Sequence, residues 1–360
     1  RIIKLITNTL PTGLNKIMRR GILLVNLGSP KSTSVEDVKE YLDEFLMDER
    51  VIDYRWFFRY LLVRGIILKT RPAKSAEAYK TIWTSEGSPL IVYTKKIKTK
   101  LQQKVDIPVE IGMRYAEPSI ETGLRKLAEQ GVTEVILFPL YPQYAMSTTE
   151  TVIAKAEEVR KLKFPNLSIK YVGSFYQQEL YLDCLAQSIK EKLPEDFDTL
   201  LFSYHGVPER HLPKVDKKIT SLIPNWGEDQ GKPLYEIDYK QQCLNTTAGI
   251  ASRLNLDGKA QTSFQSRLGK DKWIEPYTDA TLQNLPKQGK KKLVICCPAF
   301  VSDCLETLEE ISVEARSIFL NAGGETFHYI PCLNDEDRWI DVIKALVSES
   351  TEVGNHQELF

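Results

Sequence analysis

The stretches Val135-Ile-Leu-Phe-Pro139 and Leu293-Val-Ile-Cys-Cys-Pro298 are short, continuous apolar runs that each end at a proline. A continuous rather than alternating apolar run is typical of a parallel strand that helices cover on both faces. Each run follows a helical pattern that ends at a glycine, Gly131 in one case and Gly289 in the other. Because glycine commonly stands just past a helix end, both stretches predict a helix followed by a buried strand.

The likeness between these two stretches continues upstream, where an arginine, a proline and two leucines recur in the same order, with the leucines and the glycine equally spaced from the proline. The residues are Arg114, Pro118, Leu124 and Leu127 in one copy and Arg267, Pro276, Leu282 and Leu285 in the other. The strands that open the two copies also match, since Leu24-Val-Asn-Leu-Gly28 corresponds to Leu201-Phe-Ser-Tyr-His-Gly206. The sequence therefore predicts an internal repeat of two similar halves joined near residues 175–197.

Seven apolar, β-branched runs alternate with helical patterns along the chain. The expected strands cover residues 21–27, 109–113, 135–138, 169–172, 199–204, 293–296 and 326–330. This alternation indicates a doubly wound α/β architecture, in which each domain is a parallel sheet flanked by helices. Ligands of such folds bind at the carboxyl ends of the strands, and a cleft between two domains is a common site.

A chain of 360 residues is long for one core and fits two domains. We expect an N-terminal α/β domain over residues 21–180, with an apolar lip at about 55–72, and a C-terminal α/β domain over residues 181–345. Residues 1–20 are expected to form an N-terminal extension, and residues 346–360 a C-terminal tail.

The bulk composition excludes several classes of protein. Lys+Arg and Asp+Glu both number 48, so the zero net charge gives no electrostatic reason for nucleic acid as a partner. The six cysteines lack the spacing of a zinc site, and we expect buried thiols in a reducing, intracellular compartment. No apolar run reaches the roughly 20 residues that span a bilayer.

The segment from Arg55 to Lys69 combines aromatic and aliphatic side chains with four basic ones. This mixture suits a helix at a membrane surface or at the mouth of an apolar pocket. It suits equally well a buried helix whose basic side chains extend to solvent, and the sequence leaves these readings open.

An acidic stripe follows the strand that ends near Pro298. We expect a helix over residues 302–314, on which Asp303, Glu306, Glu310 and Glu314 share one face because their spacing is three, four and four residues. A solvated helix face is the common explanation for such a stripe. Its position beyond a strand end favours a path for a hard cation, since oxygen ligands suit such ions.

Other residues that could take part in catalysis or ligand binding lie at expected strand ends. His205 directly follows the strand over 199–204, where a histidine can act as a base or as a metal ligand. Tyr141, Tyr144 and Ser147 lie in one strand-end loop and Trp273 in another, and aromatic walls with a few polar groups suit a flat apolar ligand. No glycine-rich phosphate-binding motif follows any strand, which counts against a nucleotide enzyme.

These motifs together resemble the ferrochelatase family, whose members insert ferrous iron into a porphyrin at the end of haem synthesis. The resemblance covers about residues 21–340. Besides the residues above, it is carried by Leu24-Val-Asn-Leu-Gly-Ser-Pro30, Met113-Arg-Tyr115, Tyr141-Pro-Gln-Tyr144, Phe202-Ser-Tyr-His-Gly206, Gln265-Ser-Arg-Leu-Gly269 and Phe300-Val-Ser-Asp-Cys-Leu-Glu-Thr-Leu-Glu-Glu310.

The resemblance implies two Rossmann-like (chelatase-type) domains with the porphyrin held between them. It implies that His205 and Glu306 are the central catalytic pair and that the acidic helix contains a widened, π-type stretch. The residues implied for the metal are His205, Glu306, Glu310, Glu314 and Asp303. Those implied for porphyrin binding are Arg114, Tyr115, Tyr141, Tyr144, Ser147 and Trp273.

The expected function is therefore insertion of ferrous iron into protoporphyrin IX or coproporphyrin III. Two alternatives stay open: a cobalt or nickel chelatase for another tetrapyrrole, and a non-catalytic porphyrin or haem carrier. Fe²⁺ would be a substrate, with no resident cofactor and no iron–sulfur cluster. We expect a cytoplasmic monomer or homodimer, with peripheral contact to the inner membrane through residues 55–72 left open.

Overall fold

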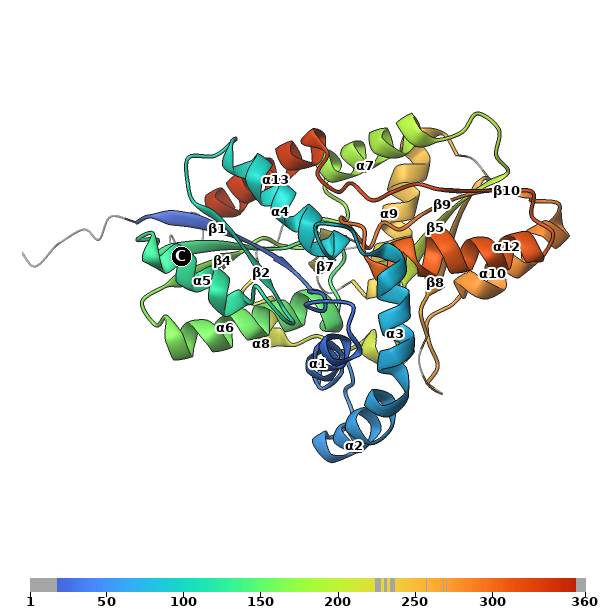
Figure 1. Ribbon diagram of the computed structural model, residues 1–360. Helices are drawn as coiled ribbons and strands as arrows, with labels where there is room; N and C mark the ends of the chain where they lie inside the picture. Colours follow the sequence, from blue (N-terminus) through green and yellow to red (C-terminus); the bar gives the residue numbers. More distant parts are fainter. Residues whose placement is uncertain are drawn as a thin grey trace, which may run out of the picture.

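The computed structural model describes residues 18–223, 228–229, 232–233, 237–256, 258–267, 269 and 271–353. Residues 1–17 of the expected extension and 354–360 of the expected tail lie outside this range. The described residues contain two four-stranded parallel sheets placed end to end, with helices on both faces of each (Figure 1). This is the two-domain α/β architecture that the sequence predicts.

The first sheet has the strand order β2-β1-β3-β4 and the second β8-β5-β9-β10, so the two orders correspond strand by strand. The first sheet consists of β1 (Arg20–Asn26), β2 (Val109–Met113), β3 (Glu134–Pro139) and β4 (Ser168–Tyr171). The second consists of β5 (Thr199–His205), β8 (Ala260–Gln265), β9 (Lys292–Cys296) and β10 (Thr326–Tyr329). The two-residue strands β6 (Glu228–Asp229) and β7 (Lys232–Pro233) pair antiparallel with each other.

The repeat extends to backbone hydrogen bonds in equivalent loops. The Met113 N–H donates to the Pro118 carbonyl over 2.7 Å, and the Phe264 N–H donates to the Pro276 carbonyl over 2.8 Å. Since Met113 pairs with Asn26, and Phe264 with Tyr204, the residue after Asn26 in the first half corresponds to His205 in the second. The predicted internal repeat is confirmed at the level of single residues.

The strand β8 was not among the seven expected strands. Its sequence Ala-Gln-Thr-Ser-Phe-Gln carries polar side chains, and its first three residues are only half-buried at the edge of the second sheet. An edge strand needs no continuous apolar run, which explains why an apolar pattern did not identify it.

Helices connect the strands in the order typical of this fold. In the first half they are α1 (Val35–Leu46), α2 (Trp56–Leu62), η1 (Val63–Ile67), α3 (Leu68–Ile82), α4 (Pro89–Gln102), α5 (Ile120–Glu129), η2 (Met146–Glu150) and α6 (Thr151–Lys163). In the second half they are α7 (Glu179–Lys192), η3 (Glu209–His211), α8 (Lys217–Thr220), α9 (Tyr239–Leu254), α10 (Thr278–Asn284), η5 (Pro286–Gln288), α11 (Leu305–Leu308), η6 (Glu310–Ala315), α12 (Arg316–Asn321) and α13 (Asp337–Val353). The elements η1, η2 and η6 are π-helical.

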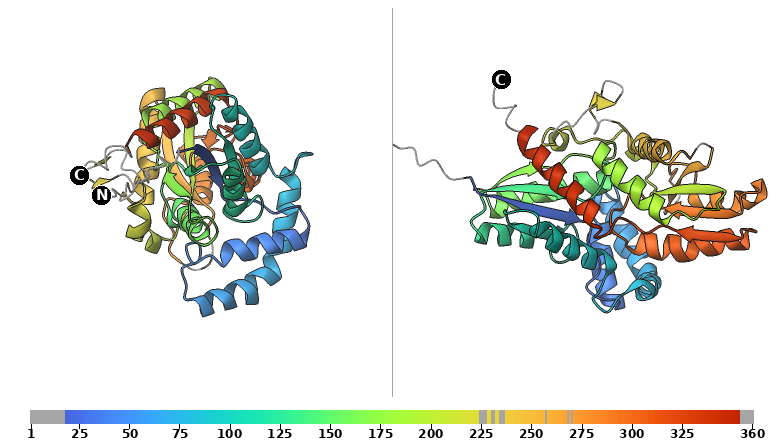
Figure 2. Two further views of the ribbon diagram at one scale, coloured as in Figure 1. Left: turned by 90° about the vertical axis from the view of Figure 1, so that its left-hand side faces the viewer. Right: turned by 90° about the horizontal axis from the view of Figure 1, so that it is seen from above.

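A common apolar core joins the two halves. Trp339 of α13 is fully buried and contacts the rings of Phe138 and Phe175 from the first half. The helix α13 packs against both α4 and α7, and it runs past residue 345, where we expected the second domain to end (Figure 2). The two sheets are therefore held at a fixed relation by buried aromatic contacts.

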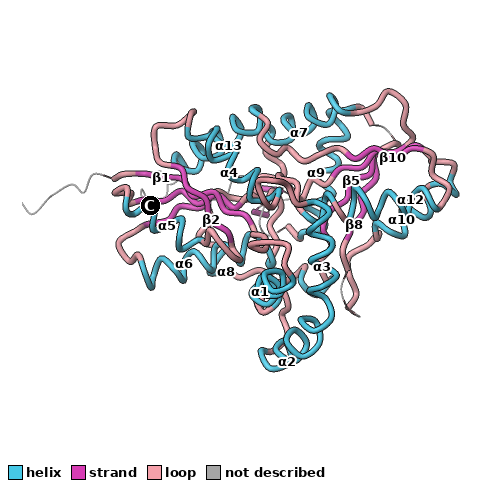
Figure 3. Tube along the Cα trace, in the orientation of Figure 1, coloured by secondary structure: helices cyan, strands magenta, loops and turns pink. Residues whose placement is uncertain are grey.

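The helices α1, α2 and α3 form an arm that projects from the junction of the two halves (Figures 1 and 3). On α2, the side chains of Trp56, Phe57 and Phe58 are each about 60% exposed, at 62%, 59% and 59%. No helix in the described part of the chain has the length and apolar character needed to cross a bilayer.

Candidate functional site

A cavity of about 540 Å³ lies between the arm and the second half. One wall comes from the end of α1, the segment over residues 51–54, and the helices α2 to α3. The other wall comes from the ends of β5 and β8, the loop around Trp273, and the helical segments α11 and η6. A volume of this size is within the range of small-molecule sites.

His205 is the last residue of β5 and lines the cavity. Its ring Nδ1 lies 2.7 Å from the carbonyl oxygen of Gly206. Because a carbonyl can only accept, Nδ1 carries the proton and donates it, which leaves Nε2 with its lone pair. Burial lowers the pKa of His205, and the nearby Glu306 carboxylate only partly opposes that effect. The imidazole is therefore neutral near pH 7 and can accept a proton or bind a metal.

Close packing explains the glycine after His205. A Cβ added at Gly206 would lie 2.9 Å from the backbone oxygen of Gln265 and 3.3 Å from the Trp273 ring. Real side chains do not fit at the first of these distances without a backbone shift. Glycine at this position therefore lets β5, β8 and the Trp273 loop meet beneath the cavity.

Three of the four carboxylates of the predicted stripe line the cavity. Glu306 lies on α11, Glu310 begins η6, and Glu314 lies near the end of η6. Glu306 and Glu310 are half-buried, whereas Glu314 is exposed. The expected π-type stretch is present, and its wider turns carry Glu310 and Glu314. The three carboxylates therefore lead from the interior to solvent.

Glu310 is an unusual carboxyl group at neutral pH. Burial raises its pKa to about 7, and the neighbouring Glu306 carboxylate adds to this rise. The Ser266 hydroxyl donates a hydrogen bond to Glu310, and with the Arg71 guanidinium it acts in the opposite direction. Glu310 can therefore gain or lose a proton close to pH 7.

Asp303 does not belong to this row, which corrects the expected helix over residues 302–314. The helix begins only at Leu305, because Cys304 has extended backbone angles and Thr307 caps its N–H. Asp303 is buried and accepts hydrogen bonds from Thr307 at 2.9 Å, Tyr329 at 2.5 Å and Asn334 at 2.7 Å. It is not among the residues that line the cavity.

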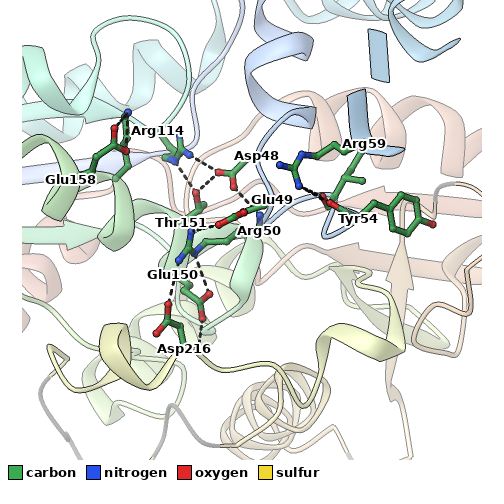
Figure 4. A network of polar contacts seen from close by, with 12 residues as sticks. Asp48, Glu49, Arg50, Tyr54, Arg59, Arg114, Glu150, Thr151, Glu158 and Asp216 are labelled. Carbon is green, nitrogen blue, oxygen red and sulfur yellow. Dashed lines mark hydrogen bonds and ion pairs between the residues drawn. The ribbon is translucent and has the colours of Figure 1, made fainter. Parts of the chain in front are cut away.

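Arg114 and Tyr115 lie behind the wall rather than on the cavity surface. Arg114 contacts Asp48 at 2.5 Å and donates to Thr151 at 2.7 Å (Figure 4). The Tyr115 hydroxyl donates to Asp48 at 2.8 Å. Burial alone would raise the pKa of Asp48, but the Arg114 charge and the Thr151 hydrogen bond hold it below its usual value. These residues anchor the end of α1.

The tyrosines of the loop after β3 are also buried in hydrogen bonds. Tyr141 donates to the Asn26 side chain at 2.9 Å, and Tyr144 donates to Glu150 at 2.6 Å. Ser147 and Tyr144 border a separate, small pocket of about 20 Å³. Trp273, by contrast, lines the large cavity.

The structure thus brings His205, Glu306, Glu310, Glu314 and Trp273 together at one cavity. It also adds Arg71, Arg210 and Ser266, which the sequence did not single out. Ser266 directly follows β8, the strand that the apolar pattern did not identify. No sequence pattern identifies Arg71 and Arg210, because their positions at the cavity depend on the tertiary packing of the arm against the second half.

No cluster of three or more His, Cys, Asp or Glu side chains in the described residues is arranged to hold a metal ion. The carboxylates at the cavity form a row rather than a closed shell.

The comparisons with known proteins agree with this geometry. The family model described as Ferrochelatase matches residues 19–351. The protein named ferrochelatase from Pseudomonas fluorescens (strain Pf0-1) is 48% identical over 329 residues, which cover 90% of this chain and 96% of that protein. The protein of the same name from Ectopseudomonas mendocina (strain ymp) is 47% identical over 337 residues, covering 92% and 98%.

A solved structure shares the fold. The structure of SirB from Bacillus subtilis with Fe³⁺ aligns with a TM-score of 0.52 and 15% identity, over 95% of this chain and 99% of that one. At this identity the likeness shows a common two-domain architecture alone. The match of the family model over most of the chain, together with relatives near half identity, decides the assignment: this chain belongs to the ferrochelatase family.

Proposed function

We propose that this protein inserts Fe²⁺ into a porphyrin in the terminal steps of haem biosynthesis. Family membership supports this function, and one observation from the site carries it. A neutral histidine and a row of carboxylates line the same largely apolar cavity. Metal insertion needs a base for the pyrrole protons, ligands for the incoming ion and apolar walls for the ring, and this cavity offers all three.

Insertion of Fe²⁺ displaces two pyrrole protons. Within this proposal His205 accepts them one after the other and passes the first to the carboxylate row before it takes the second, because its Nε2 bears a lone pair that points away from the Gly206 contact. Glu306 takes part in iron delivery, since a carboxylate suits a hard cation. The half-buried Glu310 and the exposed Glu314 carry iron inward or protons outward. Trp273 contributes an aromatic surface for the macrocycle.

The remaining expected site residues support the walls in this proposal. Asp303 fixes the start of α11 through its hydrogen bonds, so that Glu306 faces the cavity. Arg114 and Tyr115 hold the end of α1 through Asp48. Tyr141, Tyr144 and Ser147 hold the loop after β3. No resident cofactor is required, because Fe²⁺ is a substrate.

We also propose that α2 touches a membrane surface, in a protein that otherwise lies in the cytoplasm. The exposed Trp56, Phe57 and Phe58 are flanked by the exposed Arg55 and Arg64. Aromatic side chains with basic neighbours suit the headgroup region of anionic lipids. Sedimentation with anionic vesicles tests this, and a variant with Trp56→Ser and Phe57→Ser should lose binding.

The test of function is an insertion assay that compares protoporphyrin IX with coproporphyrin III. The purified protein and Fe²⁺ under anaerobic conditions should convert at least one of them to its iron complex. A spectral shift on porphyrin binding without metal incorporation would favour a carrier. Incorporation of Co²⁺ or Ni²⁺ into another tetrapyrrole, with none of Fe²⁺, would favour a different chelatase.

A further inference from the structure

An ion pair beside the cavity joins the two halves of the molecule. Asp53 follows α1 and precedes the exposed α2, whereas Arg210 lies in η3 just beyond the end of β5. Arg210 NH2 lies 2.5 Å from Asp53 Oδ1, and its Nε donates to the same oxygen over 3.1 Å. The segment that carries the first wall is thereby tied to the second wall.

Arg210 also forms an ion pair with a second carboxylate, that of Asp271. Its NH1 lies 2.5 Å from Asp271, and the Tyr54 hydroxyl donates to the same Asp271 oxygen over 3.0 Å. The guanidinium also stands 5.1 Å from the centre of the Tyr54 ring. Tyr54, Arg210 and Asp271 line the cavity and are also partly exposed to solvent, so we place the rim of the cavity at these residues. Asp53 does not line the cavity and contacts this rim through Arg210.

Asp53 is the centre of the bridge. Besides Arg210, its carboxylate contacts the Lys214 ammonium and lies 3.1 Å from His211 Nε2. Burial opposes its ionisation, but the hydrogen bonds from Arg210, Lys214 and His211 hold its pKa well below the usual value. Asp53 is therefore charged, and its partners all come from the second half.

The two ends of the segment between Asp48 and Tyr54 differ in how far their ion-paired side chains are exposed to water. At the first end, the Asp48 and Arg114 side chains are only 5% and 13% exposed, and they join elements of the first half. At the second end, the Arg210 and Asp271 side chains are 32% and 34% exposed, although Asp53 is only 10% exposed, so water can reach and replace the contacts on the Arg210 side. Exposed ion pairs are weak and screened by salt, whereas buried ones are not easily broken.

We propose that Asp53, Arg210, Asp271 and Tyr54 form a latch across the mouth of the cavity, which opens each time the flat ligand enters or leaves. The arm then moves about its fixed end at Asp48, and latch opening limits ligand release. This inference rests on the proposed function for the identity of the ligand. It assigns to Asp53 and Arg210 a positioning role that the insertion chemistry does not require.

The first test measures porphyrin dissociation without metal, by stopped-flow fluorescence with an apoprotein trap. In the unaltered protein, dissociation should become faster as the salt concentration rises. Arg210→Gln and Asp53→Asn should each accelerate dissociation about tenfold and remove most of the salt dependence. The double variant should dissociate no faster than either single variant, because both changes break the same contact.

A matched control separates the latch from general loss of surface charge. Arg253 of α9 also holds two carboxylates, those of Glu179 and Asp183, but it does not line the cavity. Arg253→Gln should therefore leave dissociation unchanged. An equal acceleration in Arg253→Gln would overturn the latch.

A second variant separates the latch from direct ligand binding by Arg210. If Arg210 only attracted the acidic side groups of a porphyrin, Asp271→Asn would slow dissociation by removing a competing negative charge. The latch predicts the reverse, since Asp271→Asn breaks one of its contacts and should accelerate release. Slower release from Asp271→Asn would contradict the proposal.

Locking the rim gives a test that does not depend on weakening the fold. The six native cysteines are buried, so Tyr54→Cys combined with Asp271→Cys can be joined selectively by a short bifunctional maleimide. Cross-linking should stop porphyrin exchange, and exchange at the original rate would overturn the latch.

If the unaltered protein bound no porphyrin, the proposed function would fail as well. Unchanged release from the rim variants of a protein that inserts iron normally would refute the latch alone.

Discussion

The two halves of the molecule share one strand order but differ in what stands at the strand ends. After β1, the first half places Leu27 in an apolar cluster with the arm, whereas at the equivalent position the second half places His205 at the cavity. Both halves have a π-helical segment after their third strand, η2 and η6. The repeated backbone therefore provides two similar frames, and among the described lining residues only the second half contributes a histidine and carboxylates to the cavity.

The carboxylates of the two π-segments show the same contrast. Glu150 of η2 is buried and lies 3.2 Å from Arg50 (Figure 4). It also accepts a hydrogen bond from the Tyr144 hydroxyl over 2.6 Å. Glu310 of η6 lines the cavity beside Glu306 and holds a raised pKa. A carboxylate with cationic and hydroxyl partners stabilises the fold, whereas one beside another carboxylate is costly to ionise and is available for chemistry.

The largest expected effect comes from removing the base. His205→Ala should lower iron insertion about 100-fold or more, which is the typical contribution of general acid–base catalysis. Porphyrin binding should persist, because the apolar walls and Trp273 are unchanged. Steady-state insertion and porphyrin titration measure the two properties separately. Turnover at the original rate would refute the assignment of His205.

A smaller, pH-dependent effect is expected at Glu310. Since its pKa lies at about 7, it is mostly charged at pH 8 and mostly neutral at pH 6. Glu310→Gln should lower insertion about tenfold at pH 8 and change it little at pH 6, because metal ligands bind best when deprotonated. Rate profiles of the two proteins between pH 6 and 8 test this. Parallel profiles would show that Glu310 does not titrate in this range.

The same raised pKa predicts a change in stability. The folded protein binds the Glu310 proton more tightly than the unfolded chain, so this stabilisation is complete below the unfolded pKa and is lost as the pH rises through about 7. Glu310→Gln should therefore unfold at higher urea concentration than the unaltered protein at pH 8, with a smaller difference at pH 5. A variant that is equally or less stable at pH 8 would contradict the cause given for the shift.

Asp303→Asn should affect the fold more than the chemistry. The change weakens buried hydrogen bonds to Thr307 and Tyr329 and should lower the free energy of unfolding by about 1–3 kcal/mol. The iron requirement should stay within about twofold wherever the variant is folded. Urea unfolding and insertion kinetics provide both numbers. A large rise in the apparent KM for iron at unchanged stability would show instead that Asp303 contributes to iron binding.

The smallest effect is expected at the exposed end of the row. Glu314→Gln should raise the apparent KM for Fe²⁺ about two- to threefold, because a screened surface charge contributes little to attraction. The KM for porphyrin should not change. The exposed Glu325→Gln, whose residue does not line the cavity, provides a control of equal charge. Equal effects of both substitutions would show that only net charge matters.

Much of the fold follows from local patterns. Seven of the eight strands of the two sheets were expected from apolar runs, and the repeat of Arg114, Pro118 and Gly131 gave the correspondence between halves. The polar edge strand β8 was missed, because its contacts with β5 do not require an apolar sequence. The start of α11 was placed too early, because the extended Cys304 and its cap at Thr307 depend on local hydrogen bonds rather than on periodicity.

The site was predicted less completely than the fold. Strand ends located His205, and helical spacing located Glu306, Glu310 and Glu314. Burial of Arg114, Tyr115 and Asp303 behind the walls depends on partners distant in sequence, such as Asp48 and Tyr329. The contacts of Arg210 at the cavity mouth depend on the tertiary packing of the arm against the second half. No spacing of residues in the sequence indicates them.

The most direct test of the central claim compares Glu306→Gln with Glu150→Gln in the same insertion assay, with porphyrin binding and thermal unfolding measured alongside. Glu306→Gln should lose insertion about 100-fold while it remains folded and binds porphyrin. Glu150→Gln should instead lose thermal stability, since it weakens the contacts with Arg50 and Tyr144, and should retain insertion within about threefold while folded. Equal losses of insertion in both variants, or normal turnover by Glu306→Gln, would contradict the assignment of the chemistry to one half of the repeat.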